Sequence, residues 1–143
     1  MLQKGLLAAV VITVIFILGF WLGKTTESKA ASKDRVFELR TYTANEGKLE
    51  ALHARFRNHT TKLFEKHGMT NVGYWSPKDA PLSQNSLVYV LAYPSREAAN
   101  KSWEEFRNDP EWKKVKQESE ANGELVKKVD FVYMDPTDYS PMK

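Results

Sequence analysis

The segment SLVYVLAY, from Ser86 to Tyr93, decides the fold that this chain can adopt. It is a near-continuous run of aliphatic, β-branched and aromatic residues, and a short run of this kind between turn residues is typical of a strand buried on both faces. The preceding loop, residues 77–85, is rich in proline and small polar residues, and Pro94 ends the run. The sequence therefore predicts a central strand with neighbours on both sides.

Two further strands and one helix are predicted before this segment. TNVGYW (70–75) and VFELRTYT (36–43) are rich in β-branched and aromatic residues, which favour strands. Between them, Asn45 is suited to cap a helix that runs to about His67, with Gly68 as its stop. Its buried face is predicted from apolar residues that fall within about 60° of each other around the axis: Leu49, Leu52, Phe56 and Leu63.

Two short helices and a last strand are predicted after the central segment. Ser95 is suited to cap a helix in which Ala99, Trp103 and Phe106 recur at helical spacing. The run 109–111, Asp-Pro-Glu, is typical of a new helix start. ELVKKVDFVYM, residues 124–134, predicts the final strand.

The order strand, helix, strand, strand, helix pair, strand predicts an α+β, ferredoxin-like domain. Its four-stranded antiparallel sheet carries helices on one face. The second face stays open and holds aliphatic and aromatic residues, and an apolar face of this size usually marks an interface. We therefore expect a homodimer in which two sheets form one barrel.

Several motifs of this domain resemble the NIPSNAP family. They are FELRTYTANEGKLEALHARFRNHTTKLFEKHGMTNVGYW (37–75), LVYVLAYPSREAANKSWEEFRNDPEWKKV (87–115) and the terminal YSP (139–141), in this order. The resemblance covers about residues 36–141. It implies a dimeric α+β barrel and little chemistry, because the family has no agreed reaction or catalytic residues. Related barrels include cofactor-free monooxygenases and haem-degrading enzymes, an analogy at the level of fold.

An apolar segment precedes the domain. Residues 6–22, LLAAVVITVIFILGFWL, contain no charge and would span about 26 Å as a helix, which Gly5 and Gly23 can extend. We expect an uncleaved anchor over residues 1–23, a flexible spacer over 24–34 and the folded domain over 35–143. Cleavage of a signal after Ala30 is the alternative.

The sidedness of the anchor follows from two opposing signals. Lys24, Lys29, Lys33 and Arg35 outnumber the positive groups before the apolar run, which favours a cytoplasmic domain. A five-residue tail ahead of a signal-like helix usually stays inside, however. We expect a single-pass membrane protein with an extracytoplasmic domain, on the periplasmic side in a bacterium.

The amino-acid composition excludes several kinds of partner and site. Twenty-one basic and 18 acidic residues give a net charge of +3, too small an excess to favour nucleic acid as a partner. The chain has no cysteine, which excludes disulfides, thiolate zinc sites and a cysteine nucleophile. No cofactor is expected. The expected partners are a second copy, the membrane through residues 5–23, and a hydrophobic small molecule between sheet and helices.

All three histidines fall on the first predicted helix. His53 and His67 would lie about 21 Å apart along it, and His59 matches neither at ligand spacing, so no metal site is expected there. His59 lies about 50° from the centre of the apolar stripe, so its ring is expected between helix and sheet. It would serve as a hydrogen-bonded core residue, or as a general base or ligand-orienting group in a pocket.

Three further candidates share one face of the first strand: Glu38, Arg40 and Tyr42. If this face lines the dimer barrel, the Glu38 and Arg40 charges must pair, which would fix the dimer register. A polar ligand site that uses Arg40 is the alternative. Arg55 and Arg57 are expected to be solvated or to pair with Glu38 of the second subunit.

Tryptophans complete the candidate set. Trp75, Trp103 and Trp112 could stack on a planar ligand, although tryptophan at this spacing is more often part of a core. The leading hypothesis is a binding or interaction module. The alternative is a cofactor-independent monooxygenase-like enzyme that acts on a hydrophobic small molecule, with His59, Arg40 and the tryptophans at its site. A third hypothesis is tetrapyrrole binding with His59 as axial ligand.

Overall fold

The computed structural model describes residues 35–143. The anchor predicted for residues 1–23 and the spacer predicted for 24–34 lie outside the described residues. Within the described part, no helix combines the length and the apolar character needed to cross a membrane.

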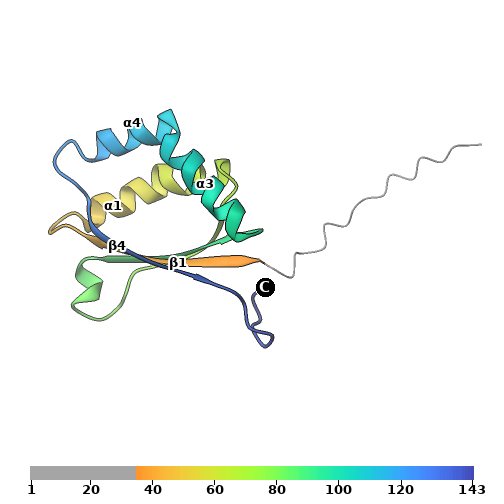
Figure 1. Cartoon of the computed structure of the whole chain (residues 1–143). Coiled ribbons are helices and arrows are strands. Elements are labelled where there is room, and N and C mark those ends of the chain that lie inside the picture. Colours follow the sequence, from red (N-terminus) through yellow and green to blue (C-terminus); the bar gives the residue numbers. More distant parts are fainter. Residues whose placement is uncertain (1–34) are drawn as a thin grey trace, which may run out of the picture.

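The domain is one antiparallel sheet with helices on one face (Figure 1). Its strands are β1 (Val36–Ala44), β2 (Thr70–Trp75), β3 (Ser86–Tyr93) and β4 (Val126–Met134), in the order β2-β3-β1-β4. Each neighbouring pair is antiparallel. This is the predicted ferredoxin-like arrangement, with β3 between β2 and β1 and buried along most of its length. The last strand begins at Val126, two residues later than predicted.

The helices cover one face of the sheet and form the core with it. They are α1 (Leu49–Arg55), the π-helical turn η1 (Phe56–Thr60), α2 (Thr61–Lys66), α3 (Arg96–Asn108) and α4 (Pro110–Ser119), and a short 3₁₀ turn η2 (Leu82–Gln84) precedes β3. The largest side chains of the core are aromatic. Phe64 lies 6.0 Å from Tyr89 and 5.0 Å from Phe106, measured between ring centroids.

The first helix differs from its prediction in two ways. It begins at Leu49, and Asn45 does not cap it: the Asn45 side chain instead donates to the Glu124 carbonyl at 2.8 Å. The π turn η1 then winds more residues into one turn than an α-helix, so later residues rotate away from the positions expected at 100° per residue. Thr60, which donates to the Arg55 carbonyl at 3.3 Å, takes the buried position expected for His59.

The predicted starts of the two later helices and the glycine stop of the first are confirmed, whereas α4 ends at Ser119, before the predicted end at residues 122–123. Ser95 accepts a hydrogen bond from the Ala98 amide at 3.1 Å at the start of α3. Asp109 accepts one from the Glu111 amide at 2.7 Å at the start of α4. Gly68 ends α2 at a φ of +76°, a conformation that favours glycine.

Asp109 does more than cap α4. Its Oδ2 lies 2.8 Å from Lys66 Nζ and 2.6 Å from His67 Nε2. These hydrogen bonds hold the pKa of the Asp109 carboxyl well below its usual range. Its charge therefore links the end of α2 to the start of α4.

Asp109→Asn is expected to lower the free energy of unfolding at neutral pH while preserving the cap, because asparagine caps as well as aspartate. A carboxyl with a depressed pKa stabilises the fold above its unfolded pKa of about 3.9 and loses that contribution as the pH falls. The difference between wild type and variant should therefore be full at pH 7 and shrink below about pH 4. Urea unfolding of wild type and variant at pH 7 and below about pH 4 measures this difference in stability. A difference that stays the same in acid would contradict the stabilising role of the Asp109 charge.

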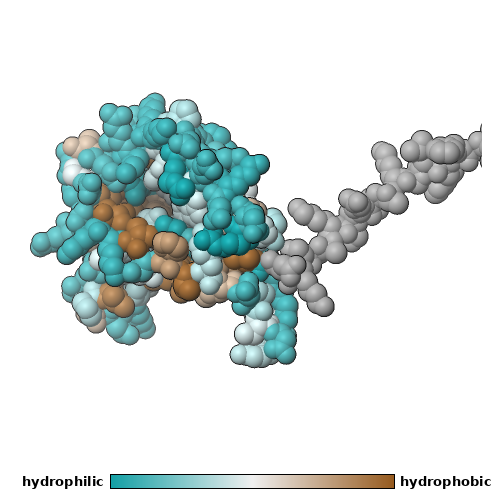
Figure 2. Space-filling view, viewed as in Figure 1, coloured by the Kyte–Doolittle hydropathy of each residue, from teal (hydrophilic) through white to brown (hydrophobic). Residues whose placement is uncertain are grey.

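The opposite face of the sheet carries no helix and is largely apolar, with the Lys128–Asp130 ion pair at one end of β4. It presents Leu39 of β1, Val90 of β3 and Val132 of β4, and residues 135–143 fold back over one end. There, Phe37 lines a cleft of about 320 Å³ with Pro136, Ser140 and Met142. Elsewhere Trp75 is 53% and Val132 50% exposed. Figure 2 shows apolar surface along the sheet layer, below the mostly hydrophilic helices. We call this helix-free side the open face.

Candidate functional site: an arginine-lined groove beside helix α3

The candidate residues of β1 point toward the helices. Glu38 contacts Trp103 of α3, and Tyr42 packs on Phe56 with ring centroids 5.8 Å apart. Alternation along a strand then places Arg40 on the same side. This face therefore does not line a dimer barrel, which was the condition under which the two charges would fix a dimer register. The Glu38–Arg40 pair lies in the interior of the domain.

Glu38 is a fully buried carboxylate with three donors. Its Oε1 accepts from Arg40 Nη1 at 2.5 Å. Its Oε2 accepts from the Tyr93 hydroxyl at 2.6 Å and from the Trp103 indole N–H at 2.7 Å. Burial raises the pKa of the Tyr93 hydroxyl, and its bond to Glu38 raises it further, so Tyr93 stays a donor. Glu38 thus ties β1, β3 and α3 together and holds Arg40 in place.

The Arg40 guanidinium is fixed between aromatic rings. Its central carbon lies 4.2 Å from the Trp103 ring centroid and 5.2 Å from that of Phe131. Burial opposes its charge, but Tyr42, Tyr89 and Glu38 outweigh this, and the pKa of Arg40 lies above its ordinary value. Its Nε is buried and donates to no atom of the described residues. Arg40 is therefore a permanent cation whose donors Glu38 does not exhaust.

Arg40 forms part of the floor of a groove of about 460 Å³ between α3 and the β4 edge. The sheet contributes Arg40, Phe131 and Tyr133. Helix α3 contributes a stripe at helical spacing: Arg96, Asn100, Trp103, Glu104 and Arg107. The walls are thus aromatic and the rim is mainly basic. We call this site the α3 groove.

The two arginines of the rim, Arg96 and Arg107, are exposed, and no carboxylate of the described residues pairs with their charges. The Arg96 guanidinium stacks on Tyr133, 3.5 Å from its ring centroid, and bonds the Asn100 side chain. Neither Arg96 nor Arg107 forms an ion pair with a carboxylate of residues 35–143. Burial raises the pKa of the Tyr133 hydroxyl, which keeps it protonated beneath Arg96.

The structure brings Glu38, Arg40 and Trp103 together, with the Tyr42 ring centroid 5.5 Å from the central carbon of the Arg40 guanidinium. The remaining candidates, Trp75 and His59, lie elsewhere. Tyr42 lies nearby, but its ring packs in the core on Phe56 and Tyr89. Trp75 is on the open face, where its indole covers Gly73 so closely that a Cβ there would lie 2.5 Å from the ring. Trp75 therefore lies on the other side of the sheet from the α3 groove.

His59 does not lie between helix and sheet. It is exposed and lines a surface depression of about 340 Å³ between η1 and α4, with Asn58 and Glu118. The π turn is the reason, since it rotates Thr60 into the core in its place. A general base or axial ligand at His59 would act on this surface, away from the Glu38–Arg40 pair.

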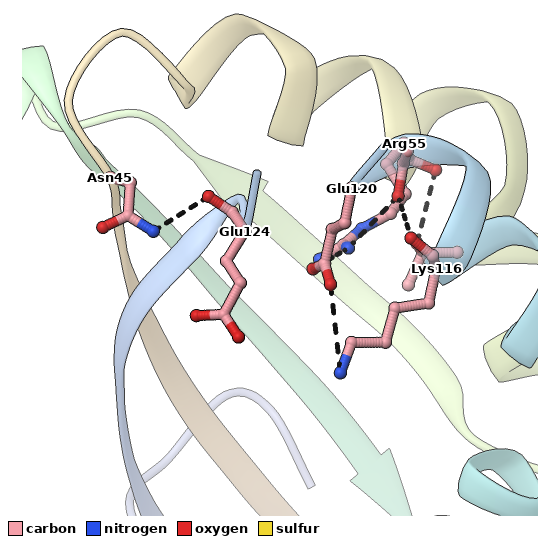
Figure 3. A network of polar contacts seen from close by, with 7 residues as sticks. Asn45, Arg55, Lys116, Glu120 and Glu124 are labelled. Carbon is pink, nitrogen blue, oxygen red and sulfur yellow. Dashed lines mark hydrogen bonds and ion pairs between the residues drawn. The ribbon is translucent and has the colours of Figure 1, made fainter. Parts of the chain in front are cut away.

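Arg55 is buried, contrary to the expectation of a solvated side chain. Its Nη1 donates to Glu120 Oε1 at 2.9 Å and to Ser119 Oγ at 3.4 Å, and Lys116 approaches the other Glu120 oxygen (Figure 3). Arg57 is 68% exposed and lies 3.8 Å from Glu50, as expected for a solvated arginine. The Arg55 network joins α1 to the end of α4 and has a structural role.

Sequence reasoning missed most of the α3 groove, namely Arg96, Asn100, Glu104, Arg107, Phe131 and Tyr133. The repeat of polar residues along α3 was a visible signal, because Arg96, Asn100 and Arg107 share one side of a helix. Their pairing with β4 was not visible, since it depends on which strand forms the edge. Among the described residues, no group of three or more histidine or acidic side chains is placed to hold a metal.

Comparison with known proteins identifies the family. The NIPSNAP family model matches residues 37–141, nearly the whole described domain. The chain belongs to the NIPSNAP family. Among curated proteins, none matches this chain.

Solved structures share the NIPSNAP fold with this chain. A NIPSNAP family protein of unknown function from Agrobacterium tumefaciens is 21% identical, with a TM-score of 0.67, over 78% of this chain and 96% of that one. A NIPSNAP-like domain protein from Burkholderia xenovorans is 17% identical, with a TM-score of 0.66, over 76% and 90%. SnoaB, a cofactor-independent oxygenase from Streptomyces nogalater, is 15% identical, with a TM-score of 0.53, over 76% and 98%. At these levels of sequence identity, the similarity shows a shared fold and nothing more.

Proposed function

We propose that this NIPSNAP protein is a homodimeric binding module that holds a small molecule in the α3 groove. The observation that carries the proposal is the Glu38-anchored guanidinium of Arg40, which forms part of a groove with aromatic walls. A rigid charged group beside apolar rings is the arrangement by which pockets orient small ligands.

Binding suits these residues better than proton transfer. The charged groups on the floor and rim are mainly arginines, which keep their protons at physiological pH and cannot act as bases. Both oxygens of Glu38 already accept from protein donors. The groove is therefore equipped to recognise charge and shape.

The open face supports the homodimer. Its exposed apolar side chains, Trp75 and Val132 among them, would leave water if two copies packed sheet to sheet. The apolar run at residues 6–22 supports the further proposal of an uncleaved membrane anchor, with the domain outside the cytoplasm. The module would then present the α3 groove near a membrane surface.

The alternative is a cofactor-independent monooxygenase-like enzyme acting on a hydrophobic small molecule in the same groove. Its support is the shared fold with SnoaB and the aromatic walls formed by Phe131, Tyr133 and Trp103. Consumption of a bound aromatic compound in the presence of oxygen would favour the enzyme, whereas unchanged recovery of the compound favours the binding module.

Native mass spectrometry of the full chain, extracted in neutral detergent, tests the binding module. We expect a dimer of uncleaved chains that binds 2-naphthoate, a soluble aromatic probe. Phe131→Ser should keep the dimer and lose the probe, because Phe131 is a 58% exposed wall of the α3 groove. Val132→Asp should yield monomers, because the variant places a charge on the open face.

Val129→Asp is the matched control for the dimer. Val129 lies on the same strand but on the helix side of the sheet, opposite Tyr42, so this variant should remain dimeric. A monomeric wild type would contradict the dimer. Equal probe binding by wild type and Phe131→Ser would contradict the assignment of the α3 groove.

A further inference from the structure

We infer that the ligand class of the α3 groove is an aromatic monocarboxylate, with its ring against Phe131 and its carboxylate at Arg96. The inference rests on the proposed function and specifies its ligand.

The charge of the groove is positive and incompletely compensated. Three guanidinium groups, Arg40, Arg96 and Arg107, face two carboxylates, Glu38 and Glu104. Glu38 is buried behind Arg40 and neutralises it, while Glu104 is exposed on the rim. A net excess of one positive charge matches a ligand with one negative charge better than a dianion or a neutral molecule.

Of the two rim arginines, Arg96 is the one fixed beside the aromatic walls. It already stacks on Tyr133, so its plane is oriented before a ligand arrives. Arg107 lies eleven positions later in the chain, about three turns or roughly 16 Å further along α3, so it adds positive charge to the groove but does not share one carboxylate with Arg96. Guanidinium groups bind carboxylates through paired N–H donors, which gives both strength and direction.

The aromatic side chains of the groove favour a ligand with a planar ring. Phe131 is 58% exposed, and its ring lies 6.0 Å from that of Tyr133 in an edge-to-face arrangement. The Arg40 guanidinium covers the face of Trp103, so Phe131 offers the most exposed aromatic surface of the groove. Aromatic rings pack against such faces with larger gains than their buried area alone provides.

The test compares 2-naphthoate with 2-naphthamide, a neutral compound of nearly the same shape. Isothermal titration calorimetry uses the full chain in neutral detergent, with the same detergent in both solutions. We expect the naphthoate Kd to be at least about tenfold lower than the naphthamide Kd, since a charge-assisted hydrogen bond is roughly twice as strong as a neutral one. Naphthoate affinity should also fall as sodium chloride rises from about 50 to about 500 mM.

Arg96→Gln locates the carboxylate, and Arg107→Gln, three turns along α3, is its comparison. Arg96→Gln should raise the naphthoate Kd about tenfold and leave the naphthamide Kd unchanged, because it removes the cation that contacts the carboxylate and no aromatic wall. Arg107→Gln should raise the naphthoate Kd less, because it removes only a more distant charge. Both residues are exposed, so the fold should survive, and circular dichroism checks this. Arg57→Gln, at an exposed arginine on η1, is the control and should change neither Kd.

The outcomes separate this inference from the proposed function. Equal Kd values for the two compounds, both lost in Phe131→Ser, would overturn the carboxylate inference and leave the binding module standing. Naphthoate binding that is unchanged in Arg96→Gln would also overturn the inference. Failure of both compounds to bind at millimolar concentration would contradict the inference and the proposed function together.

Discussion

Glu38→Gln is expected to lower the free energy of unfolding by about 3–5 kcal/mol, the usual cost of breaking a buried ion pair. Glutamine has one acceptor oxygen, whereas the Glu38 carboxylate uses both oxygens for three donors. Its amide NH₂ would therefore face a donor of Arg40, Tyr93 or Trp103. Arg40 would keep its charge beside a neutral partner.

Urea unfolding followed by circular dichroism measures this effect, at one protein concentration because the proposed dimerisation would couple to folding. The double variant Glu38→Gln/Arg40→Met removes both charges and should recover a substantial part of the loss. A single-variant loss below about 1 kcal/mol would mean that Glu38 does not hold the charge of Arg40 in the folded protein.

Trp103→Ala is expected to cost about 3–5 kcal/mol, the range for removing a large buried aromatic side chain. Trp103 is 7% exposed and packs edge-on against Phe64 and Phe106, at 5.4 and 5.6 Å between centroids. The variant also leaves one oxygen of Glu38 with a missing donor. The cavity would lie directly beneath Arg40.

Trp103→Phe separates the two contributions. It keeps an aromatic ring and removes the indole N–H, while Glu38 Oε2 keeps the Tyr93 hydroxyl as a donor. Its cost should therefore be closer to about 1.5–3 kcal/mol, the value of one hydrogen bond to a charged group. The same urea measurement serves both variants. A loss below about 1 kcal/mol for Trp103→Ala would place this ring on a ligand surface rather than in the core.

The shape of the α3 groove depends on residues of the hydrophobic core. Trp103 packs in the interior with one edge and supports Arg40 with its face. Glu38 fixes both of these side chains. Variants at Glu38 or Trp103 therefore change stability and groove together, whereas Arg96, Arg107 and Phe131 are exposed and report on binding alone.

Local sequence determined the elements of this domain. Strands β2 and β3 match the predicted segments, and the caps at Ser95 and Asp109 form as expected, because each depends on a few neighbouring residues. The order of these elements was sufficient to predict the ferredoxin-like sheet, since few topologies accommodate it. The family motifs lead to the same fold.

Tertiary structure alone decided the position of the candidate side chains. The π turn at 56–60 rotated His59 outward, because its register depends on packing and hydrogen bonding rather than on apolar spacing. The face of β1 that carries Glu38 and Arg40 could be assigned only once Trp103 of α3 lay against it, 65 positions away in the chain. The groove itself exists because α3 lies beside the edge strand β4, a contact that no local pattern encodes.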